Sequence, residues 1–215
     1  MTERRLALDT SGQTQALVVL EGKRMVAAKT WVRASREAGP PLLARIQALA
    51  EESGWRVSEL EAIGAGRGPG SFTSLRVGLS AAAGLAYGCG AKLFLLDSLR
   101  ILAGQTDQAT GALRDAGHGE AYAWRPEHSA HRLLVSDLDG WMRWDDRIVV
   151  EPAGRLADWA PKWSSAEVPP TERRPLDAAL AVVAIYEFEN GKAVRYDEVR
   201  PLYAQPAAAE ARRKP

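Results

Sequence analysis

The sequence of 215 residues has few of the residues that build disulfides and metal sites. It contains one cysteine, Cys89, and three histidines. A single cysteine excludes an intrachain disulfide, and its glycine- and alanine-rich surroundings favour a small buried residue over a reactive thiol. His118, His128 and His131 show no metal-ligand spacing with Cys89 or with each other, and the last two are expected in a solvated loop. We therefore expect no metal site.

Long apolar runs and an excess of one charge are also missing. No uncharged stretch is long enough to cross a bilayer, and residues 1–5 lack the apolar core of a signal peptide. These absences predict a cytoplasmic protein with no membrane contact. A net charge of +1 argues against a self-sufficient nucleic-acid binder, which normally carries a strong positive field. The apolar content of 46% suits a globular chain of two lobes.

The first hundred residues show a regular order of strand and helix patterns. The predicted strands cover 5–9, 16–20, 25–32, 60–65 and 92–96, and the predicted helices cover 42–53 and 74–88. Tight turns join the first three strands, which indicates an antiparallel meander. Helices separate the later strands, which therefore pair in parallel within an α/β lobe.

The second half is less regular. A turn entering a strand is expected at 115–123 and a further strand at 132–135, while 178–185 fits either a helix or a buried strand. The paired acids Asp137/Asp139 and Asp145/Asp146 lie among turn residues and are expected to face solvent. The predicted domains are a first lobe at 1–103, a second lobe at 104–205 and a frayed tail at 206–215.

A glycine-rich loop at 66–78, Gly-Arg-Gly-Pro-Gly-Ser-Phe-Thr-Ser-Leu-Arg-Val-Gly, joins a predicted strand to a helix. Such a loop can direct backbone N–H groups at an anion, or it can be a tight turn in which Ser71 or Thr73 caps the helix. The turn is favoured, and no Gly-Lys-Ser/Thr follows as in a P-loop. The candidate phosphate-contacting residues are Asp9, Thr10, Gly68, Gly70, Ser71 and Thr73.

The helix at 74–88 is rich in glycine, alanine and serine. Glycine inside a helix costs about 1 kcal/mol relative to alanine, so this composition needs a reason. Small side chains allow another helix or sheet to approach closely, either within the chain or from a partner, and both readings stay open. Neither a Gly-x-Ser-x-Gly elbow nor a Ser-His-Asp arrangement is present, and no catalytic residue is predicted.

Several segments together resemble the TsaB family, also called YeaZ. They are Asp9-Thr10-Ser11, the loop at 66–78, 96–99 (Leu-Asp-Ser-Leu), 115–122 (Asp-Ala-Gly-His-Gly-Glu-Ala-Tyr), and 201–206 with Glu210. The resemblance spans nearly the whole chain except 125–163. One departure is Ser74, which stands where the family usually has glycine.

The resemblance implies a two-lobed actin/hexokinase-like α/β fold, in which each lobe is ribonuclease-H-like with a mixed sheet flanked by helices. It implies a non-catalytic subunit that supports TsaD in forming threonylcarbamoyladenosine next to the anticodon of tRNAs reading codons that start with A. TsaE completes the assembly, tRNA is contacted indirectly, and the chain alone forms a homodimer. No cofactor is expected on the chain alone, and ATP or ADP enters only in the complex.

The family also implies that the two first-lobe helices bind TsaD. The expected interface residues are Leu42, Leu43, Ile46, Leu49, Ser74, Gly78, Ala81, Ala82 and Leu85. The metal-binding histidines of the catalytic relative have no counterpart at 36–41. Two alternatives remain: a self-contained ATP-using enzyme of the same fold, which would use Asp9 and the glycine-rich loop, and a glycoprotease-like peptidase.

Overall fold

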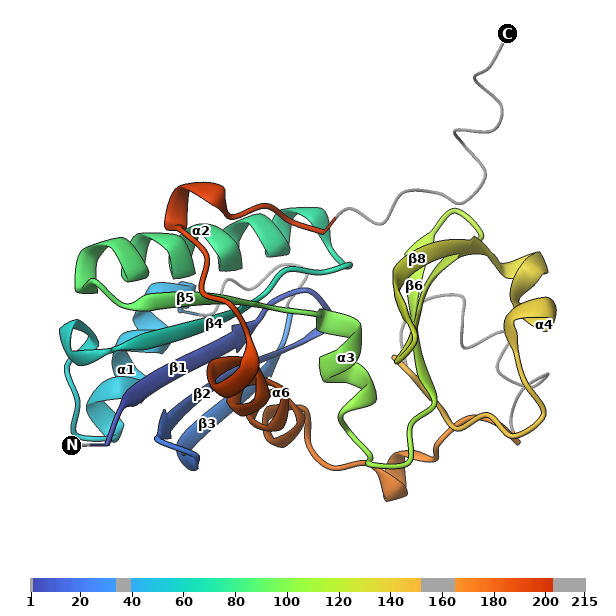
Figure 1. The fold of residues 1–215 in the computed structure, drawn as a ribbon, viewed down its shortest axis with the longest axis horizontal. Coiled ribbons are helices and arrows are strands. Elements are labelled where there is room, and N and C mark those ends of the chain that lie inside the picture. Colours follow the sequence, from blue (N-terminus) through green and yellow to red (C-terminus); the bar gives the residue numbers. More distant parts are fainter. Residues whose placement is uncertain (1, 34–39, 152–164, 203–215) are drawn as a thin grey trace, which may run out of the picture.

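The chain folds into two lobes, each built around one mixed β-sheet (Figure 1). The computed structural model describes residues 2–33, 40–151 and 165–202. The first sheet has the order β3-β2-β1-β4-β5, and the second has the order β8-β7-β6-β9. This arrangement confirms the predicted two-lobed α/β class.

The first sheet contains β1 (Arg4–Asp9), β2 (Thr14–Glu21), β3 (Arg24–Val32), β4 (Ala62–Gly66) and β5 (Lys92–Leu96). The pairs β1–β2 and β2–β3 are antiparallel, and β1–β4 and β4–β5 are parallel, as predicted. The five strands lie within one or two residues of their predicted positions. Strands β1, β2 and β4 were predictable as short apolar runs because both of their faces are buried, whereas the edge strand β3 has no fully buried residue.

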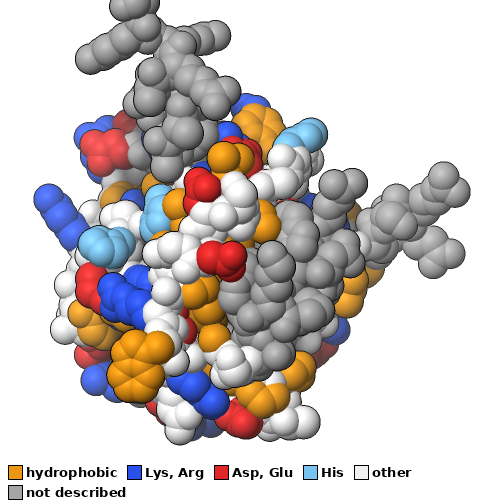
Figure 2. All heavy atoms as spheres, turned by 90° about the vertical axis from the view of Figure 1, so that its right-hand side faces the viewer, with side chains coloured by type: hydrophobic (Ala, Val, Ile, Leu, Met, Phe, Trp, Pro, Cys, Tyr) orange, Lys and Arg blue, Asp and Glu red, His pale blue; other side chains and the backbone are white. Residues whose placement is uncertain are grey.

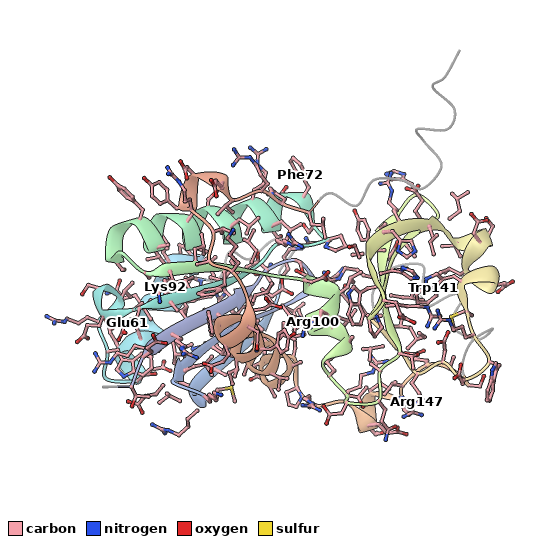
Figure 3. The ribbon with its side chains drawn as sticks, viewed as in Figure 1. Glu61, Phe72, Lys92, Arg100, Trp141 and Arg147 are labelled. Atoms are coloured by element: carbon pink, nitrogen blue, oxygen red, sulfur yellow. The ribbon has the colours of Figure 1, made fainter. Side chains whose placement is uncertain are left out.

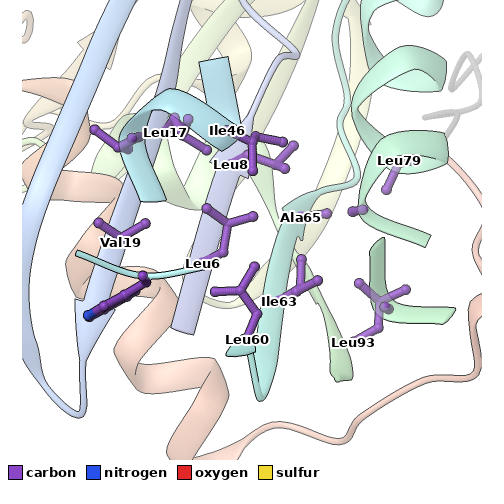
Figure 4. Close-up of a cluster of buried hydrophobic side chains, with 14 residues drawn as sticks. Leu6, Leu8, Leu17, Val19, Ile46, Leu60, Ile63, Ala65, Leu79 and Leu93 are labelled. Carbon is purple, nitrogen blue, oxygen red and sulfur yellow. The ribbon is translucent and has the colours of Figure 1, made fainter. Parts of the chain in front are cut away.

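Helices cover both faces of the first sheet. On one face, α1 (Leu42–Glu52) and α2 (Phe72–Cys89) pack over a cluster that includes Leu6 and Leu8 (Figure 4). On the other face, α3 (Ser98–Ala103) and α6 (Leu176–Asn190) pack over Ala7 and Val18. The side chains of successive β1 residues therefore point to opposite faces of the sheet and belong to two different hydrophobic clusters. Within the described part of the chain, no helix is both long and apolar enough to span a bilayer.

The return of the chain to the first lobe corrects the predicted domain boundary. Helix α6 lies inside the predicted second lobe, yet it packs on the first sheet. The segment after it also lies there: Val194 forms a bridge with Leu93 of β5, and the rings of Tyr196 and Tyr87 are 4.9 Å apart. Helix α6, Val194 and Val199 therefore pack with the first sheet, and the predicted tail at 206–215 lies outside the described residues.

The second sheet contains β6 (Gly111–Gly117), β7 (Glu120–Arg125), β8 (His128–Leu134) and β9 (Ile148–Val150). The β6–β7 turn confirms the expected turn at 115–123. The loop predicted for His128 and His131 is wrong, because both residues belong to β8. Figure 2 faces this lobe and shows acidic and basic side chains interspersed with apolar ones.

Asp146 corrects the prediction that the paired acids face solvent. Its carboxylate accepts two hydrogen bonds of 2.6 Å from Arg125, and both side chains are almost fully buried. The Arg125 guanidinium also lies 4.0 Å from the centre of the Trp141 ring on α4 (Leu138–Trp141), which Figure 3 labels. Arg125 and Asp146 are buried together because neither charge is stable alone in the protein interior.

Candidate functional site

Asp9 ends β1 and is buried, as is the neighbouring candidate Thr10. Its carboxylate accepts hydrogen bonds from the backbone N–H and the hydroxyl of Ser11, both at 3.0 Å, and from the Ser98 hydroxyl at 3.1 Å. Burial raises the pKa of Asp9, while the nearby charge of Arg114 acts in the opposite direction. These contacts match the local turn that the sequence favoured, with the carboxylate directed into the protein.

The glycine-rich loop packs directly on the turn after β1. A side chain at Gly70 would overlap the backbone of Ser11, so this position requires glycine. The N–H of Ser71 donates to the Ser11 carbonyl at 2.8 Å, and the N–H of Gly68 donates to the Ser98 hydroxyl at 3.0 Å. These two N–H groups are therefore bonded within the protein.

The start of α2 differs in detail from the predicted cap. Ser71 is the N-cap residue, but its side chain makes no capping bond and instead donates to the Ser74 hydroxyl at 3.2 Å. Thr73 is exposed in the first turn. Thr10 donates from its hydroxyl to the Ser74 carbonyl at 2.7 Å. Thus the β1–β2 turn contacts the first turn of α2 directly.

Arg114 of β6 reaches across from the second lobe into this turn. Its Nη1 atom donates to the Ser11 hydroxyl at 2.6 Å and to the Pro69 carbonyl at 2.8 Å. Its Nε atom donates to Glu151 at 2.5 Å, and that carboxylate also accepts the N–H of Gln13 at 2.9 Å. Both partners of the ion pair are nearly buried. One ion pair thus joins the two lobes.

Two cavities of about 420 Å³ each lie on either side of this pair, and Arg114 and Glu151 line both. The first cavity is also bordered by Ser11, Gly70 and Arg33. Sequence reasoning missed Arg114. The available signal was a cation directly after the apolar residues Ala112 and Leu113 within a strand, where a buried charge needs a partner.

The predicted partner residues on α1 and α2 divide into two groups. Ile46, Leu49, Gly78 and Ala82 are buried in the core of the first lobe, so they offer no surface to a partner. Leu43 is exposed, and the residues at 42, 74, 81 and 85 are partly exposed. The stripe that the sequence analysis assigned to a partner therefore includes the core-facing side of α2.

The outward side of α2 carries different apolar residues. Phe72, Val77 and Tyr87 are more than half exposed, and Figure 3 shows Phe72 at the outer side of the helix start. Gly84 and Gly88 lie on the same side with open space around them. This surface therefore has projecting apolar side chains next to positions without a side chain. Among the described residues, no group of three or more His, Cys, Asp or Glu could hold a metal ion.

Comparisons with known proteins find relatives named for tRNA threonylcarbamoyladenosine formation. The family model of TsaD, tRNA N6-adenosine threonylcarbamoyltransferase, matches residues 32–140. The tRNA threonylcarbamoyladenosine biosynthesis protein TsaB of Escherichia coli is 32% identical over 198 residues, which cover 78% of this chain and 80% of that protein. The TsaB protein of Haemophilus influenzae is 34% identical over 151 residues, covering 66% of this chain and 61% of that protein.

A solved structure extends the likeness to the fold. YeaZ from Pseudomonas aeruginosa superposes with a TM-score of 0.69 at 23% identity, covering 94% of this chain and 99% of that one. At this identity the match describes the architecture of both lobes. Together with the sequence relatives, it places the chain: this protein belongs to the TsaB (YeaZ) family.

Proposed function

We propose that this chain is a non-catalytic subunit in tRNA threonylcarbamoyladenosine biosynthesis, which binds a TsaD protein through the outward side of α1 and α2. In this role it supports TsaD as that protein modifies the adenosine next to the anticodon of tRNAs reading codons that start with A. TsaE joins the complex that this chain forms with TsaD, and tRNA is a partner of this chain only through that complex. In the absence of TsaD, the same surface pairs with a second copy of the chain.

The exposed apolar side of α2 carries this proposal. Phe72, Val77 and Tyr87 are 56%, 52% and 69% exposed on a helix whose other side is buried in the first lobe. Val77 lies between Phe72, which also borders the first cavity, and Tyr87, whose ring contacts Tyr196. Residues of this size are seldom left in water as a group, and aromatic side chains are enriched at protein interfaces. Open space at Gly84 and Gly88 lets a partner helix approach the backbone closely.

The bonding within the interlobe cleft supports a non-catalytic role. Asp9 and Thr10, two of the candidate phosphate-contacting residues, are buried and hydrogen-bonded to other residues of the chain, as is Ser11. Arg114 fills the space between that turn and the second lobe. A phosphate group that reached Asp9 or Thr10 from this side would have to displace Arg114 from its contacts with the Ser11 hydroxyl and the Pro69 carbonyl.

Size-exclusion chromatography with light scattering tests the proposal, using the chain alone and mixed with TsaD from the same organism. We expect a homodimer alone and a defined heteromer in the mixture. Val77→Asp places a charge on the proposed surface, and it should weaken the heteromer at least tenfold while the variant remains folded. Val182→Asp on α6 is the matched control, since Val182 is the same residue type with a similar exposure of 47%.

The outcomes distinguish the proposal from its alternatives. Equal loss of the complex in both valine variants, or no loss in Val77→Asp, would show that α2 is not the binding surface. Tight ATP binding and turnover by the chain alone, with no complex, would favour a self-contained enzyme. Cleavage of a glycoprotein substrate by the chain alone would favour a peptidase.

A further inference from the structure

The ion pair between Arg114 and Glu151 lies where the second lobe meets the start of α2. Its contacts form a continuous chain of hydrogen bonds. Arg114 binds the Ser11 hydroxyl, the Ser11 carbonyl accepts the N–H of Ser71, and Thr10 next to it binds the Ser74 carbonyl. Ser71 and Ser74 lie in the N-cap and first turn of α2. Each link is 2.6–2.8 Å long.

Glu151 adds a second connection between the lobes. It follows β9 in the second lobe and accepts the N–H of Gln13, which belongs to the turn between β1 and β2. Arg114 and Glu151 therefore hold the same turn from two sides. The pair is also buried, and buried charge-assisted bonds are stronger than exposed ones and costly to break singly.

We infer that Arg114 is a positioning residue, an internal cation that closes the interlobe cleft and thereby fixes the first turn of α2. Arg114 contacts the first lobe at Ser11 and Pro69 and the second lobe at Glu151, so a single guanidinium group spans the cleft. The expected consequence is an α2 N-terminus that is ordered before any partner binds. For the partner surface this inference rests on the proposed function, but the closure itself is a property of the isolated chain.

Gly12 offers a way to disturb this pair without removing a charge. A Cβ atom at this position would overlap Glu151 Oε1 and approach Arg114 Nη2 to 3.0 Å. Because the overlapping atom is the end of a side chain, Gly12→Ala should displace the Glu151 carboxylate and leave the backbone in place. Arg114→Ala instead removes the cation and leaves a space of defined shape beside the Ser11 hydroxyl and the Pro69 carbonyl.

Hydrogen–deuterium exchange of the isolated full-length chain tests the closure. In Arg114→Ala we expect amide exchange in 10–15 and 70–75 to accelerate about tenfold or more, which corresponds to the loss of one charge-assisted bond. Gly12→Ala should accelerate the same segments to a smaller degree. Exchange in 16–21, the remainder of β2, should stay at its wild-type rate. Added methylguanidinium should slow exchange in Arg114→Ala, and it should have no such effect on Gly12→Ala, which retains its own guanidinium.

Arg143→Ala is the matched control, since it removes an arginine whose ion pair with Glu127 is exposed and lies within the second lobe. It should leave exchange in 10–15 and 70–75 at the wild-type rate. Unchanged exchange in these segments of Arg114→Ala would overturn the inference. Equal acceleration throughout the chain, without rescue by methylguanidinium, would also overturn it, because that result indicates general destabilisation.

Binding to TsaD, measured by calorimetry, separates this inference from the proposed function. If both hold, Arg114→Ala weakens binding and methylguanidinium restores it. If the exchange results appear but wild-type chain and TsaD do not associate, the closure stands and the proposed function fails. If wild-type chain binds TsaD and the exchange of Arg114→Ala is unchanged, the function stands and the closure fails.

Discussion

The guanidinium group of Arg125 makes two parallel hydrogen bonds of 2.6 Å to the carboxylate of Asp146, and the two side chains are 2% and 1% exposed. Arg125 also donates to the Trp141 carbonyl, and Asp146 accepts the N–H of Arg143. This pair therefore fixes the segment between α4 and β9 against the strand β7.

Replacing Asp146 with asparagine should lower the free energy of unfolding by about 3–5 kcal/mol, because the Arg125 charge remains buried without its counter-charge. Urea denaturation at pH 7 measures this loss. Arg143→Ala, which removes an exposed ion pair with Glu127, should cost less than about 1 kcal/mol. Equal costs for the two variants would contradict the assignment of Arg125–Asp146 as a buried structural pair.

The same pair predicts a specific loss of stability in acid. Burial alone would raise the pKa of Asp146, but hydrogen bonds from Arg125, Arg143 and Thr110 outweigh burial and lower it. The unfolded chain therefore takes up this proton at a higher pH, about 3.9, than the folded protein does. The contribution of the ionised Asp146 carboxylate to the free energy of unfolding is therefore complete above that pH. It is lost as the pH falls through the lower pKa of the folded protein.

Unfolding free energies measured from pH 7 to pH 2 should therefore show wild type and Asp146→Asn converging as the pH falls. The difference should be constant between pH 7 and about pH 5, since the carboxylate is ionised in both states there. A gap that stays constant down to pH 2 would show that Asp146 does not titrate with a lowered pKa.

Two glycines of α2 should respond to alanine in opposite directions. A Cβ atom at Gly78 would overlap the Thr10 hydroxyl, so Gly78→Ala should destabilise the protein by about 1–3 kcal/mol. Gly84 has open space around it, and Gly84→Ala should stabilise by up to about 1 kcal/mol through helix propensity. Thermal unfolding of the two variants measures both effects. A tolerated alanine at Gly78 would contradict its close packing on the β1–β2 turn.

This difference also corrects the choice of a variant for partner binding. Because the sequence assigns Gly78 and Ala82 to the partner interface, a large residue at either position would be the obvious variant for blocking the partner. Both positions are buried, so such a residue would disrupt the first lobe itself. Loss of a complex would then report misfolding, which is why the exposed Val77 is the better position for that experiment.

Helix α6 should stabilise the first lobe although it follows the second lobe in sequence. Leu180 is fully buried against the sheet face that contains Ala7 and Val18, so Leu180→Ala should cost about 2–5 kcal/mol. Hydrogen exchange should accelerate in β1 and β2 before it does in β6 and β7. Leu113→Ala, a buried leucine of the second lobe, is the control and should show the reverse order. Acceleration confined to the second lobe in Leu180→Ala would restore the predicted boundary at 103/104.

The central strands of the first sheet were predictable because successive apolar residues enter two buried faces, as Leu6, Ala7 and Leu8 do. Helix α6 was not, because the stretch 178–185 is apolar almost throughout and shows no clear period. In the second lobe, short strands carry polar residues such as His128 and His131, and these obscured β8.

The candidate site was predicted only in part. Local spacing identified Asp9 and the glycine-rich loop, because their turn chemistry lies within a few residues. Arg114 and Glu151 contribute through contacts with residues that are remote in sequence, and neither belongs to a short motif. On α2, composition showed that small residues mattered, but it did not show which side faces the core, since Gly78 and Gly84 look alike in sequence.

The late position of α6 in the chain has a consequence for biosynthesis. The strands β1 to β5 leave the ribosome early, and α1 and α2 can then cover one side of their sheet. The other side, with Ala7, Val18 and Leu20, stays uncovered by α6 until residues 97–190 have been translated. At about 5–20 residues per second this lasts for seconds, which is ample time for aggregation or chaperone capture. Nascent chains stalled before residue 176 should therefore bind a chaperone, and chains that extend past α6 should be released from it.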